Sequence, residues 1–191
     1  MKKNLLLLLT LTLITTSNYA NAETTIYLVR HAEKITNSDT KDPELTAIGK
    51  FRAQNIAKQL SQVGITEIYS TQFKRTLQTA KPLANFLNFE IKDYDPSKLV
   101  EFAKQVQTMQ GHILIVGHSN TTPKLTSLLS GQKIKLIAED EYDNLYQVII
   151  TEQQTILNKF KTIPSYALNT SESGLQPRLN KNNSKAKQTN Q

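Results

Sequence analysis

The stretch Thr25-Ile26-Tyr27-Leu28-Val29-Arg30-His31 joins a continuous apolar, β-rich run to two strongly polar side chains. A run without polar alternation is typical of a strand that is buried on both faces, as in the parallel sheets of α/β proteins. The following apolar residues recur at helical spacing, beginning at a possible N-cap, Thr46, and ending at Gly64. We therefore predict a strand over 25–29 and a helix whose buried face carries Ile48, Ile56, Leu60 and Val63.

The same alternation of strand and helix is repeated three times. The predicted strands cover 67–69, 89–92 and 113–116. The helices that follow them carry apolar faces formed by Phe73, Leu77, Ala80, Ala84 and Leu87, by Leu99, Phe102, Val106 and Met109, and, from Pro123 onward, by Leu125, Leu128 and Leu129. Residues 146–151 and 155–160 form a predicted hairpin. The pattern indicates a three-layer α/β sandwich, with a mostly parallel central sheet, helices on both faces and an antiparallel hairpin at one edge.

The first 22 residues have the pattern of a secretory signal peptide. A basic start is followed by an apolar run over 5–14 and by small residues at Ala20 and Ala22, which predict cleavage after Ala22. The run is about half as long as the roughly 20 residues that span a bilayer, so an uncleaved anchor is the less favoured alternative. We expect a periplasmic or secreted protein, with no transmembrane segment after cleavage. The leader does not distinguish these two destinations.

Charge and composition exclude several classes of protein. The chain has 191 residues and no cysteine, so it has room for one domain, here 23–164, and contains neither disulfides nor thiolate metal sites. The formal charge of +7 is concentrated at the ends, and residues 23–160 carry a net charge of only +1. We therefore expect no nucleic-acid partner. Residues 165–191 are polar and basic, which predicts a disordered tail that either touches anionic surfaces weakly or has no specific role.

Polar side chains collect where the predicted strands end. Arg30 and His31 follow the first strand, Arg75 follows the second, and Gly117 and His118 follow the fourth. In open α/β sheets ligands bind at the carboxyl ends of the strands, where helix N-termini favour anions. Two arginines and two histidines at this edge predict a phosphate pocket, because a guanidinium pairs bidentately with phosphate oxygens and an imidazole can act as a nucleophile near neutral pH.

Three blocks of sequence resemble the histidine phosphatase superfamily, also called phosphoglycerate-mutase-like, in their order and spacing. They are LVRHAEK at 28–34, YST with the following RT and QTA at 69–80, and VGHSN at 116–120. The similarity covers roughly 24–160 and includes Leu45-Thr46 and Gly49; Ala32 stands where many members have glycine. The short core is similar to the small phosphatases of the family.

The resemblance implies a mechanism and a set of residues. His31 would form a phosphohistidine, and Arg30, Arg75 and His118 would bind the oxygens of the transferring phosphoryl group, without a metal or another cofactor. For the general acid the resemblance suggests Asp95, with Glu33 and Glu101 as alternatives. Taken alone, Asp95 before Pro96 is equally well explained as the N-cap of the next helix.

Further contacts are predicted less sharply. Asn37 matches a phosphate-contacting asparagine of some relatives, or it is a solvated loop residue. Lys34 and Ser119 are possible substrate contacts or surface residues. His112 is interpreted as a strand-end histidine. The acidic run 139–143 lacks a calcium-binding pattern and is interpreted as a solvated loop.

The prediction is an exported, metal-independent phosphomonoesterase that acts through His31 on an envelope or small-molecule phosphate ester. A glycolytic mutase would gain nothing from a signal peptide. The alternatives are a phosphohistidine-protein phosphatase, a non-catalytic phosphate- or phosphosugar-binding protein, and an envelope protein that works through its basic tail. The natural substrate and the oligomeric state do not follow from the sequence.

Overall fold

The computed structural model describes residues 23–36 and 39–162. The predicted signal peptide, the predicted tail and Asn37 lie outside the described residues. No helix within the described ranges has the length and apolar character needed to cross a membrane.

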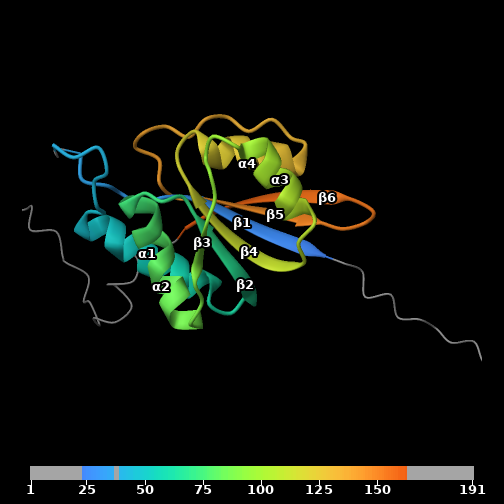
Figure 1. Cartoon of the computed structure of the whole chain (residues 1–191), viewed down its shortest axis with the longest axis horizontal. Coiled ribbons are helices and arrows are strands. Elements are labelled where there is room, and N and C mark those ends of the chain that lie inside the picture. Colours follow the sequence, from blue (N-terminus) through green and yellow to red (C-terminus); the bar gives the residue numbers. More distant parts are fainter. Residues whose placement is uncertain (1–22, 37–38, 163–191) are drawn as a thin grey trace, which may run out of the picture.

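One mixed sheet organises the domain (Figure 1). Its six strands are β1 (Thr24–Arg30), β2 (Ile65–Ser70), β3 (Ile91–Asp93), β4 (Gly111–Gly117), β5 (Asn144–Ile150) and β6 (Thr155–Lys161), in the spatial order β3-β2-β4-β1-β5-β6. The first four strands by position are parallel, and β5 runs antiparallel to both β1 and β6. The predicted parallel sheet with an antiparallel edge hairpin is confirmed.

Helices cover both faces of this sheet, with α1 (Ala47–Leu60) and α2 (Lys74–Leu87) on one side and α3 (Leu99–Gln107) and α4 (Thr121–Ser130) on the other (Figure 1). Alternate residues of β1 face opposite layers. Ile26 and Leu28 pack in the α3/α4 core, and Tyr27 and Val29 pack in the α1/α2 core. The strand that carries Arg30 and His31 is therefore buried on both faces, as its apolar run predicts.

Three local details differ from the sequence prediction. Ile48 is 58% exposed rather than buried, because the inner face of α1 is formed by Gly49, Ala53, Ile56, Ala57 and Leu60. Phe89 precedes β3 and is exposed. Helix α4 begins at Thr121 rather than Pro123; the proline still lies in the first turn, where its missing N–H costs no intrahelical hydrogen bond.

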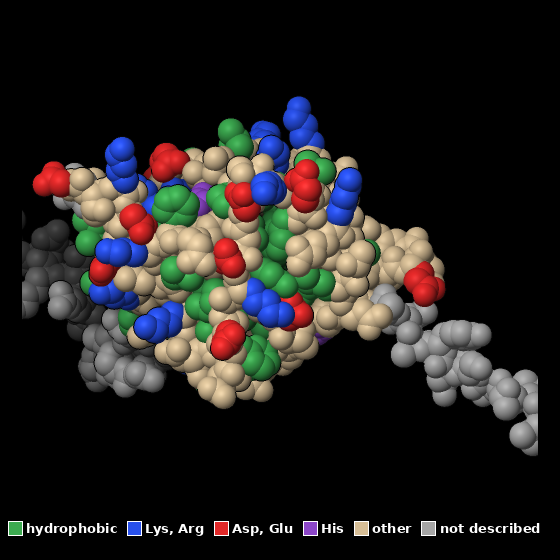
Figure 2. All heavy atoms as spheres, viewed as in Figure 1, with side chains coloured by type: hydrophobic (Ala, Val, Ile, Leu, Met, Phe, Trp, Pro, Cys, Tyr) green, Lys and Arg blue, Asp and Glu red, His purple; other side chains and the backbone are tan. Residues whose placement is uncertain are grey.

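Charges are mixed on the surface. Basic and acidic side chains are interspersed over the face drawn in Figure 2, without a continuous basic patch in that view. This distribution agrees with the small net charge of residues 23–160.

Candidate active site

His31 lies at the end of β1 and is only 3% exposed. Its Nδ1 lies 2.8 Å from the carbonyl oxygen of Ala32, which can only accept, so Nδ1 carries the proton and Nε2 presents its lone pair. Burial lowers the pKa of His31 to about 3; the Ala32 hydrogen bond opposes this shift, and the charge of Arg30 adds to it. The imidazole is therefore neutral near pH 7, which is the state a nucleophile needs.

His118 faces His31 from the end of β4, with the two ring centroids 5.5 Å apart. Its Nε2 lies 3.0 Å from Oγ1 of Thr71, and its backbone N–H donates to Oγ1 of Thr121. Burial, followed by the charges of Arg75 and Arg30, lowers the pKa of His118 to about 4. The sheet thus brings together the two histidines that the sequence predicted at this edge.

Arg30 is almost completely buried and is held by the segment 138–142. Its Nη1 donates to the carbonyl oxygens of Ala138, Glu139 and Glu141, at 2.7, 3.1 and 3.1 Å. Its Nη2 lies 3.1 Å from Oε2 of Glu139, and the ring of Tyr142 stacks 4.2 Å from the guanidinium carbon. The guanidinium therefore has a fixed orientation before any ligand binds.

Arg75, in the first turn of α2, is the second guanidinium of the site. Its Nη1 lies 3.5 Å from Oδ1 of Asp42, and its guanidinium carbon lies 4.4 Å from the centre of the Phe73 ring. The same carboxylate oxygen of Asp42 accepts the backbone N–H of Lys74 at 2.9 Å. Asp42 thus ties the 39–45 segment to the start of α2 and orients Arg75.

Both guanidinium groups keep one buried donor without a partner. Among the described residues, three buried side-chain polar atoms have no hydrogen-bond partner, and two of them are Nε of Arg30 and Nε of Arg75. Buried donors are normally paired, since an unpaired one costs roughly 1–3 kcal/mol. Two such donors beside two neutral histidines form a site suited to a compact oxyanion.

These side chains line one cavity of about 670 Å³. Lys34 and Ser119, the two possible substrate contacts, also line it, and the remaining lining residues include Phe73, Pro96, Ser97, Asn120, Thr121 and Glu139. Within the described ranges, no group of three or more His, Asp or Glu side chains is placed to hold a metal ion.

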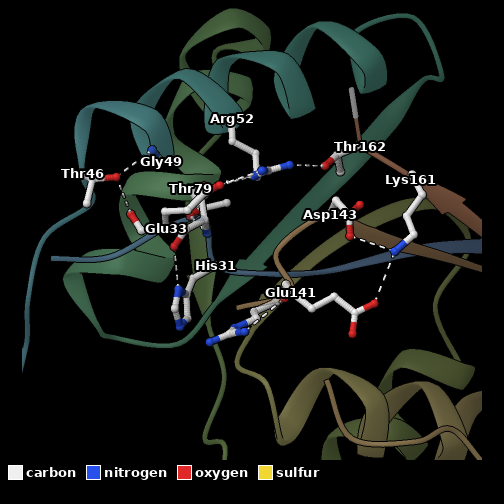
Figure 3. A network of polar contacts seen from close by, with 12 residues as sticks. His31, Glu33, Thr46, Gly49, Arg52, Thr79, Glu141, Asp143, Lys161 and Thr162 are labelled. Atoms are coloured by element: carbon white, nitrogen blue, oxygen red, sulfur yellow. Dashed lines mark hydrogen bonds and ion pairs between the residues drawn. The ribbon is translucent and has the colours of Figure 1, made fainter. Parts of the chain in front are cut away.

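The three carboxylates predicted as general acids lie outside this lining. Glu33 is bound by Arg52, whose Nε and Nη2 donate to its carboxylate at 2.6–3.0 Å, while Nη1 reaches Thr162 (Figure 3). Glu101 is exposed on α3. Asp95 is exposed and accepts hydrogen bonds from the N–H and hydroxyl of Ser97, which lower its pKa. Its interpretation as the N-cap of α3 is wrong, because the cap position is Lys98 and Asp95 closes the preceding turn.

Sequence reasoning missed the contribution of the acidic run. Glu139 was interpreted as part of a solvated loop, but its carboxylate bridges Nη2 of Arg30 and the hydroxyl of Ser119, which lies 2.9 Å away. The Ser119 hydrogen bond, with smaller contributions from Arg30 and Lys34, lowers the pKa of Glu139. The loop has no helical or strand periodicity. No pattern in the sequence therefore indicates that it packs against Arg30, which lies 108 positions before Ala138.

His112 is a strand-end residue, as the sequence predicts. His112 lies at the start of β4, at the opposite end of the sheet from the cavity, where its Nδ1 contacts the carbonyl oxygen of Val63 and its ring meets Tyr27 edge-on. It is a strand-end residue with a structural contact.

Comparison with known proteins places this site in a family. The profile of the histidine phosphatase superfamily (branch 1) matches residues 26–103. "Probable phosphoglycerate mutase GpmB" of Yersinia enterocolitica is 34% identical over 71 residues, which are 35% of this chain and 33% of that protein. GpmB of Proteus mirabilis is 41% identical over 64 residues, 31% of this chain and 30% of that protein. The chain thus spans about a third of the length of the curated relatives it matches.

Solved structures are similar over nearly the whole described domain. The protein histidine phosphatase SixA, complexed with tungstate, superposes with a TM-score of 0.63 at 16% identity, covering 75% of this chain and 99% of that one. YhfR of Bacillus stearothermophilus gives a TM-score of 0.61 at 16% identity, covering 74% and 98%. A mycobacterial glucosyl-3-phosphoglycerate phosphatase in complex with inorganic phosphate gives 0.56 at 12% identity, covering 74% and 98%. The matching profile, which covers residues 26–103, relates this chain to the histidine phosphatase superfamily. The solved structures, at 12–16% identity, show the same fold.

Proposed function

We propose that this protein is an exported phosphomonoesterase that works through a phosphohistidine on His31, without a metal ion. The observation that carries the proposal is that three residues line one cavity: His31, which is neutral with a free Nε2, and Arg30 and Arg75, each of which keeps an unpartnered Nε donor. A phosphoryl group supplies the oxygens that those donors need and the phosphorus that the imidazole attacks.

In the first step, Nε2 of His31 forms a bond to phosphorus while the bond from phosphorus to the ester oxygen breaks. Nδ1 keeps its proton, so the Ala32 carbonyl stabilises the positive charge that develops on the ring. Arg30 and Arg75 hold the equatorial oxygens, where the negative charge of a loose transition state is spread. The leaving oxygen takes a proton, for which the resemblance suggests Asp95. Because Asp95 is exposed and its pKa is lowered, it has to take up a proton from solvent and approach the cavity before it can donate.

In the second step, water attacks the phosphohistidine, releases inorganic phosphate and restores His31. The water must lose a proton. Among the described residues, Glu139 is the carboxylate that lines the cavity, and an ionised carboxylate within reach of the attacking water can accept this proton. We therefore assign the base of the second step to Glu139.

Export is the second part of the proposal. It is supported by the leader over 1–22 alone, with cleavage after Ala22. Expression of the full chain in a Gram-negative host, followed by fractionation and N-terminal sequencing, should recover a periplasmic or secreted protein that begins at Glu23. A full-length chain in the cytoplasm would contradict it.

The exported location favours an envelope or small-molecule phosphate ester as substrate. SixA is named a protein histidine phosphatase, but its 16% identity carries only the fold to this chain. Phosphohistidine-protein phosphatase activity is therefore an alternative outcome of a substrate panel that compares phosphohistidine proteins with small esters.

The mechanism is tested with residues 23–191 and p-nitrophenyl phosphate in the presence of EDTA. We expect turnover that survives the chelator and disappears in His31→Ala. His112→Ala is the matched control, because it removes the histidine at the other end of the sheet. A ³²P label that is acid-labile, base-stable and absent from His31→Ala would identify the phosphohistidine. Activity that persists in His31→Ala, or that EDTA abolishes, would overturn the mechanism.

A non-catalytic phosphate-binding protein gives a different result. Calorimetry would then show phosphate binding by the wild type, with no turnover of any ester and no label. Dependence of function on residues 165–191 but not on His31 would instead favour an envelope protein that acts through its basic tail.

A further inference from the structure

A second hollow opens from the wall of the phosphate cavity. Pro96, Asn120 and Thr121 line both, so the two lie side by side. Beyond these shared residues the hollow runs along α4 between Leu99, Lys124 and Leu136 and has a volume of about 400 Å³. We call it the α4 groove.

The outer wall of the α4 groove is fixed rather than loose. The Ser127 hydroxyl accepts the backbone N–H of Ile134 at 3.0 Å and donates to the carbonyl oxygen of Pro123 at 2.9 Å. Three residues further on, the N–H of Ile137 donates to the carbonyl oxygen of Ser119 at 3.2 Å. The segment 134–137 is thus pinned to both ends of the groove, although it lies in no helix or strand.

The groove combines apolar side chains with the polar Asn120, Thr121 and Ser127 and carries a single charge. Leu99 is buried in its floor, Ile134 packs against the α3/α4 core, and Leu136 stands at its rim with 74% of its side chain exposed. No carboxylate lines it. Lys124 is its only charged residue and makes no ion pair or side-chain hydrogen bond with any residue between 23–36 or 39–162.

The position of Lys124 relates it to the phosphate cavity. It follows Thr121 by three residues on α4, which is a rise of roughly 4.5 Å along the helix. A group that leaves the phosphorus toward the α4 groove therefore meets the shared residues Pro96, Asn120 and Thr121 first and a cation about one helical turn further on. Glu139, which lines the phosphate cavity but not the α4 groove, is paired with Arg30.

We propose that the α4 groove binds the alcohol portion of the substrate, and that it selects esters with an apolar body and a second anionic group placed away from the scissile phosphate. The proposal rests on the phosphatase function and deepens it. Leu136 contributes apolar contact and Lys124 contributes charge recognition. Both act on specificity and leave the phosphoryl transfer itself to His31.

The test compares two substrates that differ only in distal charge, 4-carboxyphenyl phosphate and 4-carbamoylphenyl phosphate. We expect the wild type to prefer the carboxylate in kcat/KM by about two- to fivefold, the range for a solvent-exposed ion pair. Lys124→Met keeps the aliphatic stem and should remove this preference. Lys58→Met, at the end of α1 on the opposite face of the sheet, is the control and should retain it.

A second variant tests the apolar part. Leu136→Ala should lower kcat/KM for both aryl esters by roughly threefold or more, because contact area with the ring is lost, and should leave glycerol 2-phosphate unchanged. Phe86→Ala removes another exposed apolar side chain, on α2, and should change none of these rates.

The outcomes separate the two proposals. His31-dependent turnover with an unchanged carboxylate preference in Lys124→Met would overturn the groove assignment and leave the phosphatase intact. If no ester is hydrolysed, the phosphatase proposal fails, and calorimetry with the same two esters still decides the groove. Tighter binding of the carboxylate ester that Lys124→Met abolishes would support the groove; equal binding of the two esters would overturn it.

Discussion

The backbone N–H of His31 donates to the carbonyl oxygen of Gly117, with a nitrogen–oxygen distance of 2.9 Å. The bond continues the β1–β4 pairing by one residue past the end of β1, where the chain would otherwise diverge. It fixes the separation of the turns that carry His31 and His118. The relative position of the two imidazoles is thus set by the backbone of the sheet and does not depend on their rotamers alone.

Gly117 leaves no room for a side chain at this junction. A Cβ there would lie 2.8 Å from the hydroxyl oxygens of Thr122 and Tyr94. We expect Gly117→Ala to lower the free energy of unfolding by about 1–3 kcal/mol, as overpacking does, and to reduce turnover severely by displacing His118. Urea unfolding and kcat/KM for p-nitrophenyl phosphate measure the two effects.

Gly131→Ala is the control for this variant. Its Cβ would meet nothing within 4 Å, but its φ of +69° is unfavourable for alanine. A cost of about 1 kcal/mol with unchanged turnover is expected. If Gly117→Ala were no less active than Gly131→Ala, the backbone junction would not position the histidines.

Arg30 and Arg75 bind phosphate through the geometry of the guanidinium group. Lysine keeps the charge but lacks the Nε donor that each arginine directs without a partner. Arg30→Lys and Arg75→Lys should each raise the inhibition constant of inorganic phosphate by roughly ten- to a hundredfold. Arg52→Lys, which weakens the bonds to Glu33 and Thr162 away from the cavity lining, should leave that constant near the wild-type value. Equal inhibition in all four proteins would contradict the assignment.

The buried neutral histidines make stability depend on pH. The pKa of His118 is about 4 in the folded protein and about 6.5 when unfolded, so the unfolded state binds the additional proton. This contribution to stability is complete above pH 6.5 and is lost as the pH falls toward 4. His118→Gln lacks it, and between pH 7 and 5 the wild type should lose about 1 kcal/mol more than the variant, allowing for partial solvent exposure.

Urea unfolding of both proteins at the two pH values, in buffer without phosphate, gives this difference directly. Burial, the largest cause of the lowered pKa of His31, is kept in His118→Gln, so most of the His31 contribution cancels. A larger loss in His118→Gln than in the wild type would reverse the sign and contradict the neutral state of His118.

The two carboxylates have different expected kinetics. Glu139→Gln should slow hydrolysis of the phosphohistidine, so that ³²P-labelled enzyme accumulates during turnover. Asp95→Asn should slow formation of the phosphoenzyme with alkyl esters, which need a protonated leaving group, more than with p-nitrophenyl phosphate. Rapid-quench measurement of labelled enzyme tests both. No accumulation in Glu139→Gln would remove Glu139 from the second step, and an unchanged rate of phosphoenzyme formation with alkyl esters in Asp95→Asn would remove Asp95 from the first.

The sequence predicts the sheet well because its strands are continuous apolar runs, a pattern that follows from burial on both faces. Ile26 to Val29 show this, and the arginines and histidines of the cavity lie at the end of β1, after β2 and just after β4. The topology alone therefore predicts that four side chains lie close together, since parallel strands end at the same edge. They are Arg30, His31, Arg75 and His118.

The irregular segments explain what the sequence could not predict. Asp42, Glu139 and Tyr142 lie in loops, where no period relates a residue to its neighbours in space. Glu139 reaches the site through an ion pair with a residue of the first strand, and Asp42 reaches it through the N–H of Lys74. Glu33 lies within the LVRHAEK block, two residues after His31, but its carboxylate is bound by Arg52 and does not line the cavity.

The hydrogen-bond partners of Arg30 are synthesised long after Arg30 itself. The carbonyl groups that hold its guanidinium come from Ala138, Glu139 and Glu141, which follow it by 108 to 111 residues. During synthesis, which proceeds at roughly 5–20 residues per second, both histidines exist before these carbonyls do. A nascent chain that stops short of residue 138 contains every side chain expected to touch the phosphoryl group, yet it leaves one of them without its support. The phosphate cavity is thus completed only as the last third of the domain is added.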